Sequence, residues 1–150
     1  MLTATTQHAL RALAALAALP PGARVLAREL ARVTNTPLNY MGKILVSLEH
    51  AGFVDGKRGA RGGYRLAKRP EEITLAEVVR LFEGSSGLPS CLMAGFRNCS
   101  DEDGCPVHSE FKKVRQAWED FLSRTTLSAV AQGAAKDLEA QRLLWSPEGG

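Results

Sequence analysis

The chain has 150 residues, 45% of them hydrophobic and 23% charged, values that favour one folded domain with an appended element and exclude wholesale disorder. Its formal net charge of +3 is unevenly distributed: residues 1–83 hold twelve lysines and arginines against seven acidic residues, and residues 84–150 hold seven against nine. The basic first half favours a polyanionic partner.

The alanine- and leucine-rich start of the chain differs from a secretion signal, because it lacks a positively charged leading segment and contains Arg11 within the apolar run. No run reaches the roughly 18 apolar residues that a membrane span requires. The sequence therefore predicts a cytoplasmic protein with no membrane partner.

Helical periodicity predicts two helices in the first 33 residues. The first covers about residues 4–19 and ends at the Pro-Pro-Gly sequence of residues 20–22. The second is short, over about residues 26–33, with Leu26, Leu30 and Val33 on one face.

A third helix is predicted over about residues 37–51, with Thr36 as its N-cap, Pro37 in its first turn and Gly52 at its end. Its buried stripe is predicted to contain Leu38, Met41, Ile44, Leu45 and Leu48, and its outer face Asn39, Tyr40, Lys43 and Ser47. Two helices joined by a short turn, the second with a polar outer face, are typical of a helix-turn-helix. Two core helices of another bundle would give the same pattern.

The next segment is predicted to form a β-hairpin, because two short alternating runs, residues 53–58 and 63–67, flank a glycine-rich tip. Six basic residues and one acidic residue lie between positions 53 and 70. Arginines on such a tip suit contact with phosphates or with a narrow minor groove. A solvated basic turn is the alternative, but the position after a helix-turn-helix favours a DNA-binding wing.

The remaining sequence predicts a helix over residues 73–84, a loop over residues 84–104, and a long helix after Pro106. About twenty residues without periodicity are unusual inside a domain, and such loops are usually functional or disordered. The long helix has a broad apolar face, which predicts burial against a second subunit in a homodimer. This face consists of Val107, Phe111, Val114, Trp118, Phe121 and Leu122. A short helix over about residues 127–141 and a frayed tail are expected to follow.

All three cysteines, Cys91, Cys99 and Cys105, lie in or at the end of the loop. Their odd number favours a metal or redox site over a disulfide framework, and hence a reducing compartment. Three thiolates and an imidazole form a complete ligand set for an iron–sulfur cluster. Zinc accepts the same ligands, but the close cysteine pair of common zinc sites is missing, and reactive free thiols are a third possibility.

The fourth ligand is open. Two residues separate His108 from the third cysteine. An imidazole in the first turn of a helix tends to stay neutral, as a metal ligand must. Gln7 and His8 of a dimer mate are less favoured candidates.

The chain resembles the Rrf2 family of bacterial regulators over about residues 1–131. The matching pieces are TPLNYMGKILVSLEHAGFVDGKRGARGGYRLAKRPEEITLAEVVRLFEG and the three cysteines ahead of the long helix. The hairpin RGARGGYRLA followed by ITLAEVV is specific, whereas the cysteine pattern is looser.

This resemblance implies a dimer that binds a palindromic operator, usually as a repressor, with the state of a cluster altering its affinity for DNA. The family's DNA contacts fall on the recognition helix and the wing, and the set expected here is Thr36, Asn39, Tyr40, Lys43, Arg58, Arg61 and Gly62. In IscR-like members the ligands are three cysteines and a histidine, which matches Cys91, Cys99, Cys105 and His108. Gly42 stands where IscR has an acidic residue that discriminates between sites.

The predicted fold is mainly α: a winged helix-turn-helix DNA-binding domain at 1–83, a cluster-binding loop at 84–105, and dimerisation and C-terminal helices at 106–145. The protein is expected to sense redox, nitric oxide or iron status through a 2Fe–2S cluster, with 4Fe–4S as second choice and zinc less favoured. A cofactor-free thiol switch and a zinc-stabilised regulator are the alternatives. The sequence has no HExxH, GxSxG, P-loop or dinucleotide motif, so no enzymatic activity is predicted.

Overall fold

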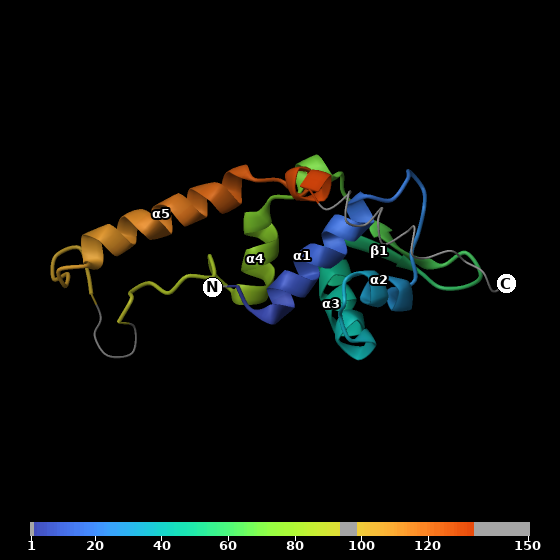
Figure 1. Ribbon diagram of the computed structural model, residues 1–150, viewed down its shortest axis with the longest axis horizontal. Helices are drawn as coiled ribbons and strands as arrows, with labels where there is room; N and C mark the ends of the chain where they lie inside the picture. The colour runs from blue at the N-terminus through green and yellow to red at the C-terminus, as the bar shows by residue number, and fades with distance from the viewer. Residues whose placement is uncertain (1, 94–98, 134–150) are drawn as a thin grey trace.

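The computed structural model describes residues 2–93 and 99–133, which form a mainly helical fold with one β-hairpin (Figure 1). The elements in chain order are α1 (Ala4–Ala17), α2 (Ala27–Val33), α3 (Leu38–His50), β1 (Val54–Lys57), β2 (Gly63–Leu66), the short 3₁₀ helix η1 (Pro70–Glu72), α4 (Leu75–Glu83) and α5 (His108–Arg124). Residues 127–133 are also helical. The predicted continuation of this helix to residue 141 and the frayed tail lie outside the described residues.

Helix α1 is the centre of the main core. It packs against α2, α3, α4 and the hairpin, and Ala9, Ala12 and Leu13 have no exposed surface. Alanines let neighbouring helices approach closely, so the large side chains of α3 fill the remaining space. Met41, Ile44, Leu45 and Leu48 are all buried, as predicted for the inner stripe of α3.

Two predictions about α3 are wrong. Pro37, not Thr36, is the N-cap residue, and no side chain caps the helix; the Thr36 side chain is instead buried among α1 and the turn. Leu38 was assigned to the inner stripe, but it is 55% exposed. Because each residue of an α-helix is rotated by about 100° from the one before, Leu38 lies just past the edge of the apolar stripe.

The hairpin pairs β1 with β2 in antiparallel register, from Val54 opposite Leu66 to Lys57 opposite Gly63. A third segment joins it, because Val25 forms a bridge with Tyr64 through two backbone hydrogen bonds of 3.0 and 2.8 Å. Gly63 has a φ of +121°, and a Cβ there would lie 2.7 Å from the carbonyl oxygen of Val25. Only glycine allows this close approach at the base of the wing.

Helix α4 begins with a capping box in which Thr74 accepts from the Glu77 N–H and the Glu77 carboxylate accepts from the Thr74 N–H at 2.8 Å. The chain returns to this point after α5. Thr74 and Thr126 form a bridge, and the Leu127 N–H donates to the Ile73 carbonyl at 2.7 Å. Leu127 is fully buried in the main core. The C-terminal end of α5 is therefore fixed to the winged unit, which we define as residues 2–83.

Helix α5 extends away from the other helices (Figure 1). Leu122, near its C-terminal end, is buried against Leu75 and Val79 of α4, whereas Val114 is 57% and Phe121 45% exposed. Apolar side chains on a protruding helix are typical of a surface that another chain covers. Part of the predicted apolar stripe of α5 is therefore exposed, whereas Leu122 is buried within the chain, and the burial of this face against a second subunit stays a prediction.

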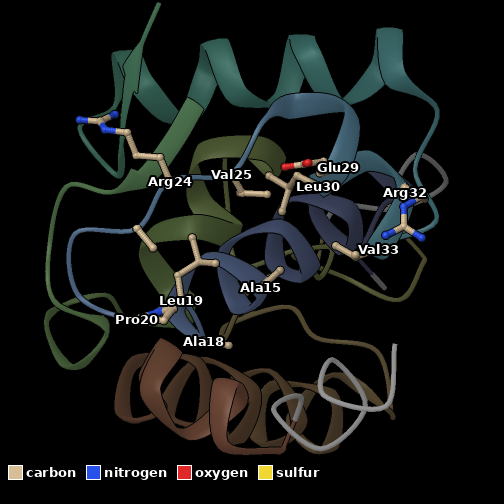
Figure 2. A pocket seen from close by; sticks show the side chains of 11 residues that line it. Ala15, Ala18, Leu19, Pro20, Arg24, Val25, Glu29, Leu30, Arg32 and Val33 are labelled. Carbon is tan, nitrogen blue, oxygen red and sulfur yellow. The ribbon is translucent and has the colours of Figure 1, made fainter. Parts of the chain in front are cut away.

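An apolar pocket of about 290 Å³ lies between the C-terminal end of α1 and α2 (Figure 2). Its walls include Ala15, Leu19 and Leu30. The Arg24 side chain extends away from these residues, and its guanidinium is bound by the wing. No helix among the described residues is both long and apolar enough to cross a membrane.

Candidate DNA interface and cysteine site

The outer face of α3 carries Asn39 and Lys43, both exposed. These two side chains are one turn apart on the same side of the helix, so they face a common surface. The structure therefore leaves them available for contact with DNA, as predicted.

Tyr40 was predicted to face outward, but it is only partly exposed, because its ring and hydroxyl contact α1. The hydroxyl hydrogen-bonds with that of Thr5, and the ring packs edge-on against the His8 ring at 5.6 Å. His8 also binds the recognition helix, since its Nδ1 lies 2.8 Å from Thr36 Oγ1. Thr36 and Tyr40 thus fix the start of α3 to α1.

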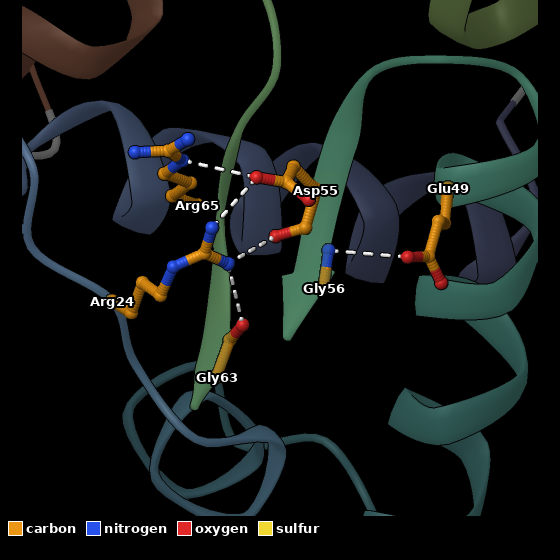
Figure 3. Close-up of polar contacts among 6 residues, drawn as sticks. All are labelled: Arg24, Glu49, Asp55, Gly56, Gly63 and Arg65. Carbon is orange, nitrogen blue, oxygen red and sulfur yellow. Dashed lines mark hydrogen bonds and ion pairs between the residues drawn. The ribbon is translucent and has the colours of Figure 1, made fainter. Parts of the chain in front are cut away.

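The wing is fixed at its base by Arg24. This guanidinium donates to the Asp55 carboxylate at 2.7 Å and to the carbonyls of Asp55 and Gly63, both at 3.0 Å (Figure 3). Arg65, opposite Asp55 in the hairpin, adds a 3.1 Å contact. The hydrogen bond from Arg24, with the charges of both arginines, holds the pKa of the Asp55 carboxyl below its usual value.

A second carboxylate joins the wing to the recognition helix. Glu49, on the last turn of α3, accepts from the Gly56 N–H at 3.1 Å (Figure 3). Glu49 thus connects the hairpin to α3, whereas Asp55 connects it, through Arg24, to the segment between α1 and α2. The sequence patterns did not reveal either role.

The tip of the wing presents Arg58 and Arg61, both exposed. Gly62 closes the tip, since its N–H donates to the Gly59 carbonyl at 2.9 Å and a Cβ at this position would lie 2.3 Å from the Lys57 carbonyl oxygen. Gly62 therefore shapes the loop that presents the two arginines.

The cysteine segment, which we define as residues 84–105, contains Cys91, buried, and Cys99 and Cys105, both partly exposed. The thiol of Cys99 interacts with those of both other cysteines. A backbone hydrogen bond from Cys105 lowers the pKa of Cys99, but desolvation and the two neighbouring thiols outweigh it, so this pKa lies above its ordinary value. The fold thus places the three thiols next to one another across the segment.

His108 is the first residue of α5, and its N–H donates to the Cys105 carbonyl at 2.9 Å. Its Nε2 lies 3.1 Å from an oxygen of Asp101, whose second oxygen accepts from Lys112 at 2.6 Å. The hydrogen bond from Lys112, and then that from His108, lower the pKa of the Asp101 carboxyl. The imidazole is therefore beside the third cysteine but bound to a carboxylate.

The donor chemistry fits an iron–sulfur cluster or another soft metal centre, because three thiols lie in one segment and an imidazole follows them closely in sequence. Among residues 2–93 and 99–133, however, no three His, Cys, Asp or Glu side chains form a group that could hold a metal ion as they stand. His108 can ligate through Nδ1 while Nε2 keeps its contact with Asp101, as metal-bound imidazoles commonly do, so ligation would require the thiols to turn toward a common centre.

The two less favoured ligand candidates have other contacts. The Gln7 amide donates to the Leu2 carbonyl at 3.2 Å, and the His8 ring lies between Thr36 and Tyr40. Both residues are on α1 and make these contacts within the chain, and ligation by the copies on a dimer mate stays a prediction.

Two further hydrogen bonds attach the part of the cysteine segment before Cys91 to α5. The Trp118 indole donates to the Ser86 carbonyl at 2.7 Å and the Arg115 guanidinium to the Ser90 carbonyl at 3.4 Å. At its start, the Glu83 carboxylate accepts from the Thr6 hydroxyl and from the N–H of Thr3, the latter at 2.8 Å. The segment therefore begins at a fixed point shared by α1 and α4.

Comparison with known proteins agrees with this arrangement. Residues 2–133 match the Rrf2 family, described as an iron-dependent transcriptional regulator. A putative HTH-type transcriptional regulator of Aquifex aeolicus (strain VF5) is 33% identical over 136 residues, which cover 89% of this chain and 93% of the relative. The HTH-type transcriptional regulator NsrR of Geobacillus kaustophilus (strain HTA426) is 31% identical over 134 residues, 89% of this chain and 91% of the relative.

Among solved structures, that of CymR (YrzC), the global cysteine regulator of B. subtilis, is similar with a TM-score of 0.72 and 26% sequence identity. The match covers 88% of this chain and 96% of that chain. The similarity thus extends beyond the winged unit into the cysteine segment and α5.

Proposed function

This chain belongs to the Rrf2 family and is a DNA-binding transcriptional regulator, and from that premise we propose that it represses transcription as a homodimer under the control of an iron–sulfur cluster. In this proposal α3 and the wing bind a palindromic operator, and the state of the cluster alters the affinity for it. The cluster ligands are Cys91, Cys99, Cys105 and His108.

The observation that carries the proposal is the contact of the Cys99 thiol with the thiols of both Cys91 and Cys105. Seven and five residues separate these positions in sequence, so the fold, not the local chain, brings them together. Three adjacent thiols are the ligand type that iron–sulfur clusters require, and the matched family is described as iron-dependent. We favour a 2Fe–2S cluster over 4Fe–4S, and either over zinc.

The DNA face combines an exposed helix with a basic hairpin. Lys43 and Asn39 of α3 are positioned to contact base edges in the major groove, and Arg58 and Arg61 of the wing to contact phosphates or the adjacent minor groove. Tyr40, Thr36 and Gly62 act by positioning these groups, because their side chains or backbone are engaged within the protein.

The homodimer is supported by the apolar face of α5. Its exposed side chains, Val114 and Phe121, lie on a helix that protrudes from the winged unit (Figure 1). A two-fold pair of such helices would place two copies of α3 for the two halves of a palindrome.

A bound cluster supplies an oxidant-sensitive centre whose loss releases its protein ligands. The residues of this chain then determine what the release changes. Asp101, itself held by Lys112, orients the His108 ring through Nε2. Trp118 and Arg115 carry a change in the segment to α5, and Glu83 carries it to α1 and hence to the start of α3.

Anaerobic purification tests the cluster. We expect a coloured protein with iron and acid-labile sulfide in a one-to-one ratio, and we expect the Cys99→Ser variant to lose both. Mössbauer or resonance Raman spectra would then identify the cluster type. A colourless protein with one zinc per chain would refute the cluster and favour the zinc-stabilised regulator.

Operator binding tests the DNA face. Lys43→Ala should cost about 1–3 kcal/mol and relax specificity if Lys43 contacts a base, and Arg61→Ala should reduce the slope of affinity against salt by about one unit if Arg61 contacts a phosphate. Lys113→Ala, which removes an exposed lysine on α5, serves as the control. Wild-type affinity in both test variants would refute the proposed face.

A cofactor-free thiol switch is the second candidate, favoured by the same thiol contacts and by the similarity to a global cysteine regulator. It requires metal-free, reduced protein to bind the operator and an oxidant such as hydrogen peroxide to release it. The two candidates differ in one measurement, because iron chelation would leave operator binding by a thiol switch unchanged.

A further inference from the structure

Two large apolar side chains are exposed on the recognition helix. Leu38 is 55% and Val46 is 51% exposed, although α3 otherwise buries its apolar residues in the core. An exposed valine by itself needs no explanation. Its position on this helix is informative, because it lies among the residues proposed to face DNA.

Val46 lies near the middle of the exposed face of α3. It follows Asn39 by seven residues, two turns of helix, so the two side chains lie on one line along the surface. Gly42 is between them, and a Cβ on Gly42 would meet nothing within 4 Å. The stretch of α3 around Gly42 is therefore a shallow surface, with the Asn39 amide on one side of it and Val46 on the other.

Positive charges border this surface. Lys43 lies on one side, and Arg28 and Arg32 of α2 line a depression together with Leu38 beside the start of α3. A protein partner of ordinary composition has no general reason to prefer an apolar patch surrounded by cations. The major groove of DNA does, because it is lined by phosphates and contains one apolar group, the C5-methyl of thymine.

We propose that Val46 contacts a thymine methyl group in each half of the operator. The inference rests on the proposed DNA-binding function and adds a base preference to it. Asn39, two turns away, is a side chain suited to a bidentate contact with adenine. The half-site is thus expected to contain A·T pairs where the centre of α3 lies over the groove.

The test replaces thymine by uracil, which removes only the methyl group, at each position of an operator selected from random DNA by the wild-type protein. At one position per half-site we expect an affinity loss of about fourfold, the size that burial of one methyl group gives. The Val46→Ala variant should bind the thymine operator about as weakly as wild type binds the uracil operator. It should show no further loss with uracil.

The matched control is Leu81→Ala, which truncates an exposed leucine on α4, outside the proposed DNA and dimer surfaces. This variant should respond to uracil as the wild type does. Urea unfolding of Val46→Ala should match the wild type, because an exposed side chain contributes little to the core.

Several outcomes would overturn the inference while leaving the proposed function intact: equal uracil effects in wild type and Val46→Ala, or no uracil effect at any position. Conversion of a dimer to a monomer by Val46→Asp in the absence of DNA would also overturn it, because the patch would then be a subunit interface. Failure of the wild type to select any operator would instead refute the DNA-binding face, and the inference with it.

Discussion

The winged unit and the cysteine segment are stabilised in different ways. In the winged unit, a continuous core around α1 is supplemented by polar contacts that fix each surface element: Arg24 and Glu49 hold the wing, and His8 holds the start of α3. The described part of the cysteine segment has Cys91 as its buried side chain and is attached to α5 by hydrogen bonds from Trp118 and Arg115.

This difference separates two requirements of a regulator. A DNA-binding surface gains affinity when it is formed before binding, because less conformational entropy is lost. A sensing segment must instead change its contacts when its ligand state changes, and regions with few buried contacts do so at low free-energy cost. Four pairs of substitutions test whether the winged unit is the fixed region and the cysteine segment the adaptable one.

The largest effect is expected from leucine truncation. Leu45→Ala removes a side chain with no exposed surface and should lower the free energy of unfolding by about 2–5 kcal/mol. Leu92→Ala, in the cysteine segment, removes a side chain that is 60% exposed and should change it by less than about 0.5 kcal/mol. Urea unfolding of reduced, metal-free protein measures both. Equal losses would show that the segment is packed as tightly as the core.

The next effect concerns two glycines with positive φ. Gly63→Ala would place a Cβ 2.7 Å from the backbone oxygen of Val25, which cannot move without opening the wing, whereas Gly87→Ala would meet a methyl group of Leu2 at 3.0 Å, which can rotate. Both variants incur backbone strain of about 1–3 kcal/mol, and we expect Gly63→Ala to lose more stability. It should also weaken operator binding, as measured by fluorescence anisotropy, while Gly87→Ala should not. The reverse order would contradict a rigid wing base.

A smaller effect is expected at the helix starts. Thr74→Ala removes the cap of α4 and should cost about 0.5–2 kcal/mol. The start of α5, next to the cysteines, has no side-chain cap, so Ser109→Ala in its first turn should change the free energy of unfolding by less than about 0.5 kcal/mol. Urea unfolding of both variants provides the comparison. A large loss in the second would reveal a cap that forms in solution.

The smallest effect concerns pH. Because Arg24 and Arg65 lower the pKa of folded Asp55, this carboxylate stabilises the fold fully above its unfolded pKa of about 3.9 and loses that contribution as pH falls through the lower folded value. The urea midpoint of Asp55→Asn should therefore fall less between pH 6 and pH 3 than that of wild type. Asp101→Asn should alter this acid response less, since its carboxylate is 68% exposed against 42% for Asp55. An unchanged response in Asp55→Asn would refute the role of the Arg24 pair.

Periodicity predicted the winged helix-turn-helix, the hairpin and the long helix, because burial of one face leaves a repeating pattern in the sequence. It assigned the wrong exposure to Leu38 and Tyr40, which lie at opposite edges of the buried stripe of α3. An apolar residue at the edge of a stripe can be exposed and an aromatic one can be buried by a neighbouring helix, and only the position of α1 decides between these outcomes. The Thr36 cap failed for a related reason, since His8, 28 positions earlier, binds the hydroxyl.

The candidate site was predicted unevenly. The exposure of cations such as Lys43 and Arg61 follows from their positions in the periodic pattern. The grouping of the three cysteines follows from their spacing in the sequence. Arg24 could not be found in this way, because its partners in the hairpin lie more than 30 positions away and no local pattern relates them. The pairing of Asp55 with Arg65 could have been predicted from the register of the two alternating runs, which places them opposite each other.

Gly42 has a consequence for how such a regulator diversifies. Any side chain introduced there would point from the middle of α3 into open space, since no protein atom lies within 4 Å of its Cβ position. Replacing a glycine inside a helix is also expected to stabilise the helix by roughly 0.5–1 kcal/mol. A side chain at this position would therefore add a new group to the exposed face of α3 at no cost to the fold, so the surface presented to DNA can change there without rebuilding the core.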